Sequence, residues 1–370
     1  MRITTVAVLA LSLAVAGGAF AQSSGPKYRL ELIDTFASNV YVSQLYVNES
    51  GLVGAFGSNT TVGKQSIRWS GPGQFVTTPT SLGLTPLWLS NTGRFAGVSN
   101  PPAGGIVSVA LDGSATQINP PQQVGSYRTV AAVAPNDAYT GTDDFGVQHG
   151  YRVGTGAGDQ YVSANGGFER LTGVIGMNDS GVVAGTYLDP SGGPGPNRAW
   201  VARDGVARVL PEVVNGLAGL TMARDLDSRG RVLGTSTRNG VDRTVIWGED
   251  DAPSLVVPPT GFAITQTIRF NASSTVLAYY SSTTGLQPGY FGISTPAGTY
   301  RWQDLIEGGT AGLEIQGFSD ISDSGYIVGN VAVNGVNRAF RMVPLNPVPE
   351  PGALAALGLG AAALLRRRRR

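Results

Sequence analysis

A short phrase that recurs seven times along the chain is the feature that most constrains its fold. The phrase joins a turn of Asn, Asp or Ser with Gly to a short apolar run that ends in Gly or Ala. The clear copies are Val47–Gly54, Leu89–Gly97, Met177–Gly185, Leu226–Gly234 and Ile321–Gly329, with degenerate copies at Ala134–Gly141 and Phe270–Ala278. Neighbouring copies lie 42 to 51 residues apart, with a mean of about 46. That period is the length of one four-stranded propeller blade.

The residue types within the phrase fit tight turns between buried strands. Asn or Asp followed by Gly suits a hairpin, because Gly accepts positive φ and the Asn or Asp side chain bonds its own backbone. Apolar runs such as Val182-Val183 and Ile327-Val328 fit strands that are buried on both faces. The small residues after these runs would let strands crowd near a central axis. The 53 glycines of the 370-residue chain are accounted for largely by such turns and strand ends.

The two ends of the repeat array complement each other. The last copy runs out after Val343 without a final strand, and an unassigned strand at Tyr28–Asp34 precedes the first copy. Giving that strand to the last blade would remove two exposed sheet edges. The sequence therefore predicts an all-β fold, a seven-bladed β-propeller of four-stranded repeats closed by an N-terminal strand that joins the last blade. The alternatives are six or eight blades, an open β-solenoid, or two β-sandwiches.

A second phrase follows each turn by about 14 to 19 residues and often ends in an aromatic residue. Examples are Asn197-Arg198-Ala199-Trp200, Gly335–Phe340 and the segments that end at Trp69 and Trp247. We interpret these three tryptophans as packing residues at equivalent repeat positions. The phrase resembles the extracellular HAF-type repeat, with Arg198 and Arg338 in place of the family's histidine.

The first 21 residues have the pattern of a secretory signal peptide. Arg2 supplies the positive charge, Val6–Ala16 forms a short apolar run, and Ala19 and Ala21 are the small residues before the cleavage point. The apolar run is shorter than the roughly 20 residues that a membrane span needs. We expect signal peptidase to act after Ala21, and the domain organisation to be 1–21 signal peptide, 22–346 propeller and 347–370 sorting signal.

The C-terminal residues contain three elements in a fixed order. Pro349, Glu350 and Pro351 come first, and the apolar stretch Gly352–Leu365 follows. The last element is Arg366, Arg367, Arg368, Arg369 and Arg370. As a helix, the 14 apolar residues would span about 21 Å, which is short of the roughly 30 Å hydrocarbon core.

This tail resembles the PEP-CTERM sorting signal of Gram-negative, exopolysaccharide-producing bacteria. The resemblance implies transient residence in the inner membrane and cleavage by an exosortase near Pro349, Glu350 and Pro351. It also implies a final location at the cell surface or in the extracellular matrix. The alternative is a plain C-terminal anchor with a basic stop-transfer tail.

Removal of both ends would change the charge of the chain. The precursor has 26 basic and 25 acidic residues, whereas loss of Arg2 and the five terminal arginines leaves 20 basic residues and a net charge of about −5. An acidic mature chain offers no basic field for nucleic acid. We therefore expect no nucleic-acid partner.

Few catalytic chemistries are open to this composition. The chain has no cysteine and one histidine, His149, so thiolate and histidine-cluster metal sites are excluded, and no Gly-x-Ser-x-Gly elbow occurs. Carboxylates cluster in predicted turns at Asp143/Asp144, Glu249–Asp251 and Asp304/Glu307, but no pair stands out. We assign no catalytic residue and no cofactor.

Two weaker ligand hypotheses remain from the residue pattern. Asp179, Asp227 and Asp323 recur in the repeat turn, which leaves calcium as a candidate ion. Trp88 and Trp302 fall outside the repeat register and are the candidates for exposed contact with a glycan. The chain is expected to be an exported, non-catalytic binding or scaffold propeller linked to exopolysaccharide or biofilm. The alternative is an extracellular carbohydrate-active hydrolase or lyase with carboxylates in the propeller funnel.

Overall fold

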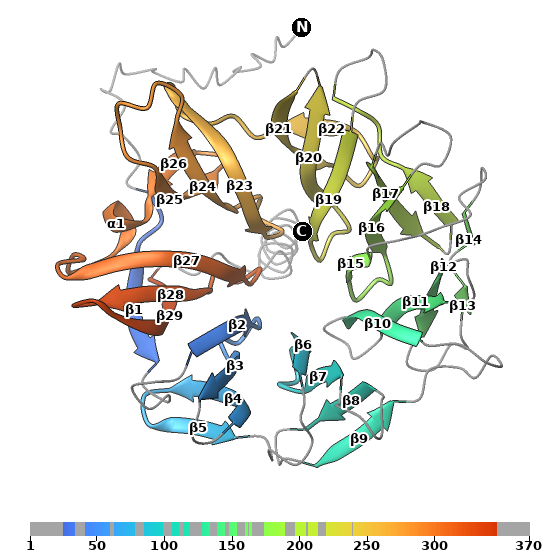
Figure 1. The fold of residues 1–370 in the computed structure, drawn as a ribbon, viewed down its shortest axis with the longest axis horizontal. Coiled ribbons are helices and arrows are strands. Elements are labelled where there is room, and N and C mark those ends of the chain that lie inside the picture. Colours follow the sequence, from blue (N-terminus) through green and yellow to red (C-terminus); the bar gives the residue numbers. More distant parts are fainter. Residues whose placement is uncertain are drawn as a thin grey trace, which may run out of the picture.

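The computed structural model is built almost entirely of β-strands. It describes residues 25–33, 41–59, 63–77, 85–98, 106–110, 114–118, 128–133, 139–144, 148–153, 160–161, 163–164, 174–188, 197–204, 206–213, 220–238 and 240–345. Within these ranges there is one helix, the single turn α1 (Trp302–Leu305). The strands form seven sheets, six of four strands and one of five. Figure 1 shows these sheets arranged around a common centre.

Each sheet begins with a strand that lies nearest the centre in Figure 1. In the order of sheets 1 to 7, these first strands are β2 (Tyr41–Val47), β6 (Thr85–Leu89), β10 (Arg128–Val133), β15 (Val174–Met177), β19 (Leu220–Leu226), β23 (Phe262–Phe270) and β27 (Leu313–Ile321). The second strands, in the same order, are β3 (Val53–Asn59), β7 (Phe95–Val98), β11 (Tyr139–Asp144), β16 (Val183–Leu188), β20 (Val232–Arg238), β24 (Val276–Ser282) and β28 (Ile327–Val333).

Third and fourth strands follow outward from the centre. The third strands are β4 (Gly63–Gly71), β8 (Ile106–Val109), β12 (Gln148–Val153), β17 (Asn197–Arg203), β21 (Val241–Trp247), β25 (Tyr290–Thr295) and β29 (Val336–Pro344). The fourth strands are β5 (Gln74–Thr77), β9 (Ala115–Ile118), β13 (Gln160–Tyr161), β18 (Val206–Val209), β22 (Pro253–Leu255), β26 (Gly298–Arg301) and, in sheet 7, β1 (Tyr28–Ile33). Sheet 4 gains its fifth strand because β14 (Ser163–Ala164) pairs in parallel with β18.

The repeated turn phrase forms the hairpin between the first and second strands. Five turn glycines have φ between 74° and 90°, a range in which glycine is favoured, and they are Gly51, Gly93, Gly181, Gly230 and Gly325. The Asn48 side chain accepts hydrogen bonds from the backbone N–H groups of Ser50 and Leu52, at 3.1 and 3.0 Å. The sequence-based turn chemistry is therefore confirmed in the described hairpins.

Glycines in the second strands make room for large side chains as well as for the neighbouring strand. A Cβ atom at Gly54 would lie 2.5 Å from the Phe95 ring of sheet 2, and one at Gly185 would lie 2.6 Å from the Trp200 ring. A Cβ at Gly234 would lie 2.1 Å from the backbone oxygen of Met222 and 2.7 Å from Trp247. These glycines make room for large rings, and Gly234 also lets the innermost strand of its sheet approach closely, as expected.

The core lies between adjacent sheets. One buried cluster joins Ala184, Val201 and Leu210 of sheet 4 to Val232 and Trp247 of sheet 5. Such face-to-face contact explains why the strands are apolar on both sides.

The three repeat tryptophans, Trp69, Trp200 and Trp247, are each at most 1% exposed, as the packing hypothesis requires. Their register is not uniform. Trp69 and Trp247 pair with Val53 and Val232, whereas Trp200 pairs with Gly185, two residues further along the second strand.

Sheet 7 combines the beginning and the end of the described chain. Strand β1 pairs antiparallel with β29, from Tyr28 opposite Pro344 to Ile33 opposite Ala339. The backbone N–H of Leu345 donates to the Lys27 oxygen at 2.8 Å, and that of Glu307 donates to the Tyr28 oxygen at 2.9 Å. The first described strand thus fills the outer position of the last sheet.

Several sequence predictions lie outside the described residues. The signal peptide with Ala19 and Ala21, the segment at Pro349, Glu350 and Pro351, the apolar stretch and the terminal arginines all belong to this group. Among the residues that the structure does describe, no helix has the length and apolar character needed to cross a membrane.

Candidate functional site

A pocket opens where the first strands end, at the centre of the sheet arrangement. Its volume is about 110 Å³. Six of the sheets contribute the last residue of the first strand to its wall, and these residues are Val47, Leu89, Met177, Leu226, Phe270 and Ile321. The repeated turns add polar groups to the rim, including Asn48, Asn91, Asn178, Asp227 and Ser322. The same sequence phrase therefore builds the pocket from several sheets at once.

One register position of the first strand supplies three charged side chains to the pocket wall. Counted two residues before the start of each turn, this position holds Tyr46, Trp88, Ala132, Gly176, Asp225, Arg269 and Asp320. In six of these strands, β6, β10, β15, β19, β23 and β27, a β-bulge immediately precedes it. Bulges bend a strand and re-aim the side chains that follow. Acidic and basic residues occupy the position only in sheets 5, 6 and 7.

Asp225, Arg269 and Asp320 form a charged cluster across three sheets. The Arg269 guanidinium lies between the two carboxylates, 3.6 Å from Asp225 Oδ1 and 3.7 Å from Asp320 Oδ1. The side chains of Asp225 and Asp320 are 14% and 11% exposed, and that of Arg269 is 30% exposed. The single positive charge of Arg269 thus lies beside two nearly buried carboxylates at the wall of the pocket.

Both carboxylates also accept hydrogen bonds from backbone N–H groups of the neighbouring sheet. Asp225 Oδ2 accepts a 2.8 Å hydrogen bond from the N–H of Phe270 in sheet 6, and Asp320 Oδ2 accepts one of 2.9 Å from Val47 in sheet 1. Asp320 Oδ1 accepts a third from Ile321 at 3.0 Å. Their positions are consequently fixed by the strands and not by side-chain packing alone.

Burial dominates the acid–base properties of this cluster. It raises the pKa of Asp320 to about 7 and that of Asp225 to about 6, although the Arg269 charge and the backbone N–H donors oppose the rise. The two carboxylates raise the pKa of Arg269 above its ordinary value against the effect of its own burial. Burial also raises the pKa of the nearby Tyr46 hydroxyl to about 12. The cluster can therefore take up a proton near neutral pH.

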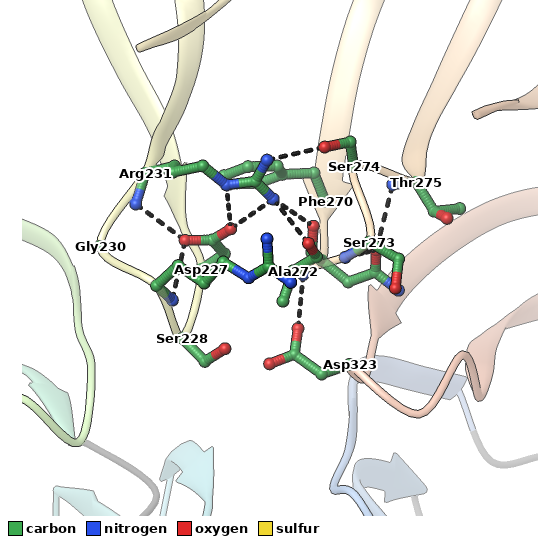
Figure 2. A network of polar contacts seen from close by, with 12 residues as sticks. Asp227, Ser228, Gly230, Arg231, Phe270, Ala272, Ser273, Ser274, Thr275 and Asp323 are labelled. Atoms are coloured by element: carbon green, nitrogen blue, oxygen red, sulfur yellow. Dashed lines mark hydrogen bonds and ion pairs between the residues drawn. The ribbon is translucent and has the colours of Figure 1, made fainter. Parts of the chain in front are cut away.

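Arg231 ties the pocket rim together between sheets 5 and 6, as Figure 2 shows. Its guanidinium donates to Asp227 Oδ2 at 2.7 Å and to Ser274 Oγ at 2.7 Å. It also donates to the backbone oxygens of Asn271 and Ala272, each at 3.0 Å. In the same view, Asp323 of sheet 7 accepts a 2.6 Å hydrogen bond from the Ala272 N–H.

Comparable bonds continue the rim through the neighbouring sheets. The side-chain amides of Asn48, Asn178 and Asn271 each donate to a backbone oxygen in the turn of the next sheet, at 3.0 to 3.1 Å. Between sheets 7 and 1, the Glu49 carboxylate accepts the N–H groups of Asp323 and Ser324, at 2.9 and 2.7 Å. Charged groups therefore bridge the rim on both sides of sheet 7, which makes this part of the pocket a preformed polar surface.

The two tryptophans proposed for glycan contact have different outcomes. Trp302 is 1% exposed and belongs to the core cluster beside Tyr28 and Leu305, so the expectation of an exposed aromatic is wrong there. Its position in α1, which packs under the first described strand, explains the burial. Trp88 occupies the charged register position in sheet 2, opposite Ala96, and its glycan role stays a prediction.

Other candidate groups have less support from their placement. His149 pairs with Asp143 in the β11–β12 ladder, so it lies in a strand. Of the turn aspartates suggested for calcium, Asp227 is bound by Arg231 and Asp323 by a backbone N–H. No group of three acidic or histidine side chains suited to a metal occurs among the described residues.

The repeat pattern alone did not single out Asp225, Arg269 and Asp320. A usable signal was present, because all three lie at the same distance from the repeated turn. Charged residues next to the apolar ends of buried strands break the repeat pattern, and such exceptions are expected at functional sites.

Comparison with known proteins identifies the tail and the fold. Residues 347–370 match the PEP-CTERM protein-sorting motif. This motif indicates an exported protein that an exosortase sorts to the cell surface. No curated protein matches the chain.

Several solved enzymes have a similar, propeller-like fold. Oligogalacturonate lyase from Vibrio parahaemolyticus is 12% identical with a TM-score of 0.54, and the match covers 88% of this chain and 98% of that one. Virginiamycin B lyase from Staphylococcus aureus is 11% identical with a TM-score of 0.51, covering 86% and 100%. A puromycin-hydrolysing peptidase from Mycobacterium tuberculosis is 10% identical with a TM-score of 0.55, covering 85% and 54%. The chain accordingly has an all-β, propeller-like fold and carries a PEP-CTERM sorting motif.

Proposed function

We propose that the mature chain is a seven-bladed β-propeller that acts as a binding or scaffold protein at the cell surface. Each of the seven sheets would be one blade, and the pairing of β1 with β29 would close the ring. Rings closed in this way leave few exposed sheet edges. The bonds of Glu49 to sheet 7 support the same closure from the pocket side.

The proposed route to the surface has two cleavages. Signal peptidase would act after Ala21, and the exosortase near Pro349, Glu350 and Pro351, which removes the terminal arginines. Mass spectrometry of the surface protein tests this route, since the expected mature chain begins at Gln22 and lacks Arg366–Arg370. An intact arginine tail on surface protein would contradict the second cleavage, and an intact N-terminus would contradict the first.

The central pocket is the proposed binding site, with exopolysaccharide as the proposed ligand class. The observation that carries this proposal is a rigid polar rim built from equivalent turns, with amide, carboxylate and hydroxyl groups facing one pocket. Groups of these types bind the hydroxyls of sugars through paired hydrogen bonds. The HAF-type resemblance and glycan contact by Trp88 are secondary parts of the same proposal.

A pair of tryptophan substitutions tests the binding site. Ser228→Trp would fill the pocket mouth from an exposed turn, and Gln287→Trp would place the same side chain in the exposed loop beyond β24, at the far end of sheet 6. Retention on the native matrix polysaccharide and on a glycan array should fall at least tenfold for the first variant and stay unchanged for the second. Equal retention of the two variants, or no retention of the wild type, would refute the pocket as a glycan site.

A second candidate function is carbohydrate cleavage in the same pocket. Asp225 and Asp320 share one arginine, and their raised pKa values would let one donate a proton while the other stays ionised. The fold of lyases and peptidases offers a precedent for the architecture alone. If the pocket is catalytic, the wild type should release reducing ends from the matrix polysaccharide, and Asp320→Asn and Asp225→Asn should each abolish that release. Binding without release in the wild type favours the scaffold function.

A further inference from the structure

The two ends of the described chain leave the fold at one place. Tyr28 lies opposite Pro344 in the β1–β29 ladder, and the Lys27 oxygen accepts the N–H of Leu345. The Lys27 ammonium also donates to the backbone oxygen of Asp304 at 3.0 Å. Both the segment toward the predicted signal peptide and the segment toward the sorting motif therefore start from the same edge of sheet 7.

That place is on the same end of the molecule as the pocket. Across sheet 7, Ile321 at the pocket wall lies in one row with Ile327, Met342 and Leu30. Pro344 and Tyr28 lie two residues beyond this row, and Pro344 lies 3.8 Å from the Cβ position of Gly325 in the turn. We call this end, with its repeated turns and the pocket, the pocket face. The β28–β29 hairpin lies at the opposite end, which we call the far face.

The chain that joins the fold to the apolar stretch is short. Seven peptide steps separate Leu345 from Gly352, so covalent geometry limits this tether to about 25 Å. Strand β29 has nine residues, which gives the sheet a height of about 27 Å. If the far face rested on the membrane, the tether would have to pass the full height of the sheet and then about 6 Å of headgroups. The covalent reach is too small for that orientation.

We propose that the membrane-anchored precursor holds its pocket face toward the bilayer, and that cleavage at the sorting motif releases this face. The constraint is purely one of chain length, since the tether starts on the pocket face and cannot reach around the sheet. The inference rests on the proposed anchorage of the tail in the membrane and is independent of what the pocket binds. It makes the sorting cleavage a step that exposes the pocket as well as one that frees the protein.

Single cysteines can measure this orientation, because the chain has no native cysteine. Ser228→Cys places a thiol on the pocket face, and Val241→Cys places one at the far end of the same sheet, where Val241 is 56% exposed. Each full-length variant is labelled with a fluorophore and reconstituted into phosphatidylethanolamine–phosphatidylglycerol vesicles that carry a headgroup quencher. We expect at least twofold stronger quenching at position 228 than at position 241.

A lengthened tether is the matched control. Inserting 40 Gly and Ser residues after Leu345 gives the tether a root-mean-square reach of about 35 Å, so the difference between the two positions should disappear. Equal quenching at both positions with the native tether would overturn the orientation while leaving anchorage intact. Failure of the precursor to float with the vesicles would overturn the inference together with the proposed anchorage. Unchanged melting of both cysteine variants confirms that the labels report on the native fold.

Discussion

Two arginine–carboxylate clusters join the sheets, and they have opposite charge ratios. At the junction of sheets 7 and 1, the Glu31 carboxylate is held by Arg341 at 2.5 Å and by Arg29 at 2.8 Å. In the pocket, Asp225 and Asp320 share the one guanidinium of Arg269. Burial alone would raise the pKa of Glu31, but its two arginines hold that pKa below the ordinary value. Burial prevails in the pocket, where both aspartate pKa values are raised.

The Glu31 cluster is a structural junction whose carboxylate is fully neutralised, whereas the pocket cluster has one more carboxylate than arginine. Arg341 also lies over the Trp69 ring, 4.5 Å from its centroid, and donates to the Gly51 oxygen of sheet 1. Its contacts are thus complete within the fold. The pocket cluster keeps more acid than base beside a cavity, an arrangement that costs stability and is typical of functional sites.

Removing the first described strand should have the largest effect on the junction. Deletion of residues 27–33 takes away β1, Glu31 and the cover over Leu305 and Met342, and leaves the β29 edge open. We expect loss of the cooperative unfolding transition in circular dichroism and calorimetry. A synthetic peptide of residues 25–33 should restore part of the transition when added in excess, whereas a scrambled peptide should not. An unchanged melting profile after the deletion would show that the strand is dispensable.

A single substitution at Arg341 should have the next largest effect. Arg341→Leu removes the partner of Glu31 and the donor to sheet 1, and should lower the free energy of unfolding by about 3 to 5 kcal/mol. The matched control is Arg29→Leu, since the Arg29 side chain is 60% exposed and should contribute less than about 1 kcal/mol. Urea denaturation of the two variants measures the difference. Similar losses in both would mean that the junction does not depend on the buried arginine.

The repeat made the fold largely predictable from sequence. Turn residues such as Asn48 and Gly51 act locally, so their pattern is read directly from neighbouring positions. The exposure of Trp302 was not predictable in this way, because its burial depends on a strand about 270 residues earlier that packs over α1. Contacts between residues so far apart in the sequence cannot be inferred from the roughly 46-residue repeat pattern.

The candidate site was less predictable for a related reason. Arg269 looks like any strand-end residue until the bulges of β19, β23 and β27 bring it between Asp225 and Asp320. Each of the three charges comes from a different repeat, and only the packing of sheets 5, 6 and 7 side by side makes them neighbours. The three charges nevertheless share one register position, at which the other repeats hold uncharged residues.

The pH dependence of stability should differ in sign between the two clusters. Asp320 has a raised pKa in the folded state, so the stability that it contributes is complete below about pH 4 and is lost as the pH rises through about 7. Glu31 has a lowered pKa, so its contribution is complete above the ordinary pKa of a glutamate and is lost as the pH falls. We expect the free-energy difference between wild type and Asp320→Asn to shift by about 2 kcal/mol or more between pH 4 and pH 8, in favour of the variant at high pH.

The matched variant Glu31→Gln tests whether the ratio of carboxylates to arginines in each cluster sets the sign of the pH dependence. The free-energy difference between wild type and Glu31→Gln should shift in favour of the wild type as the pH rises from about 3 to about 5, and then stay level. Asp320→Asn loses one acceptor for the Val47 and Ile321 N–H groups at every pH, so its constant offset is separable from the slope. Slopes of the same sign in the two variants would show that Arg269 neutralises its carboxylates as fully as Arg341 and Arg29 neutralise Glu31. The pocket would then hold no charge surplus for a ligand or a proton transfer to use.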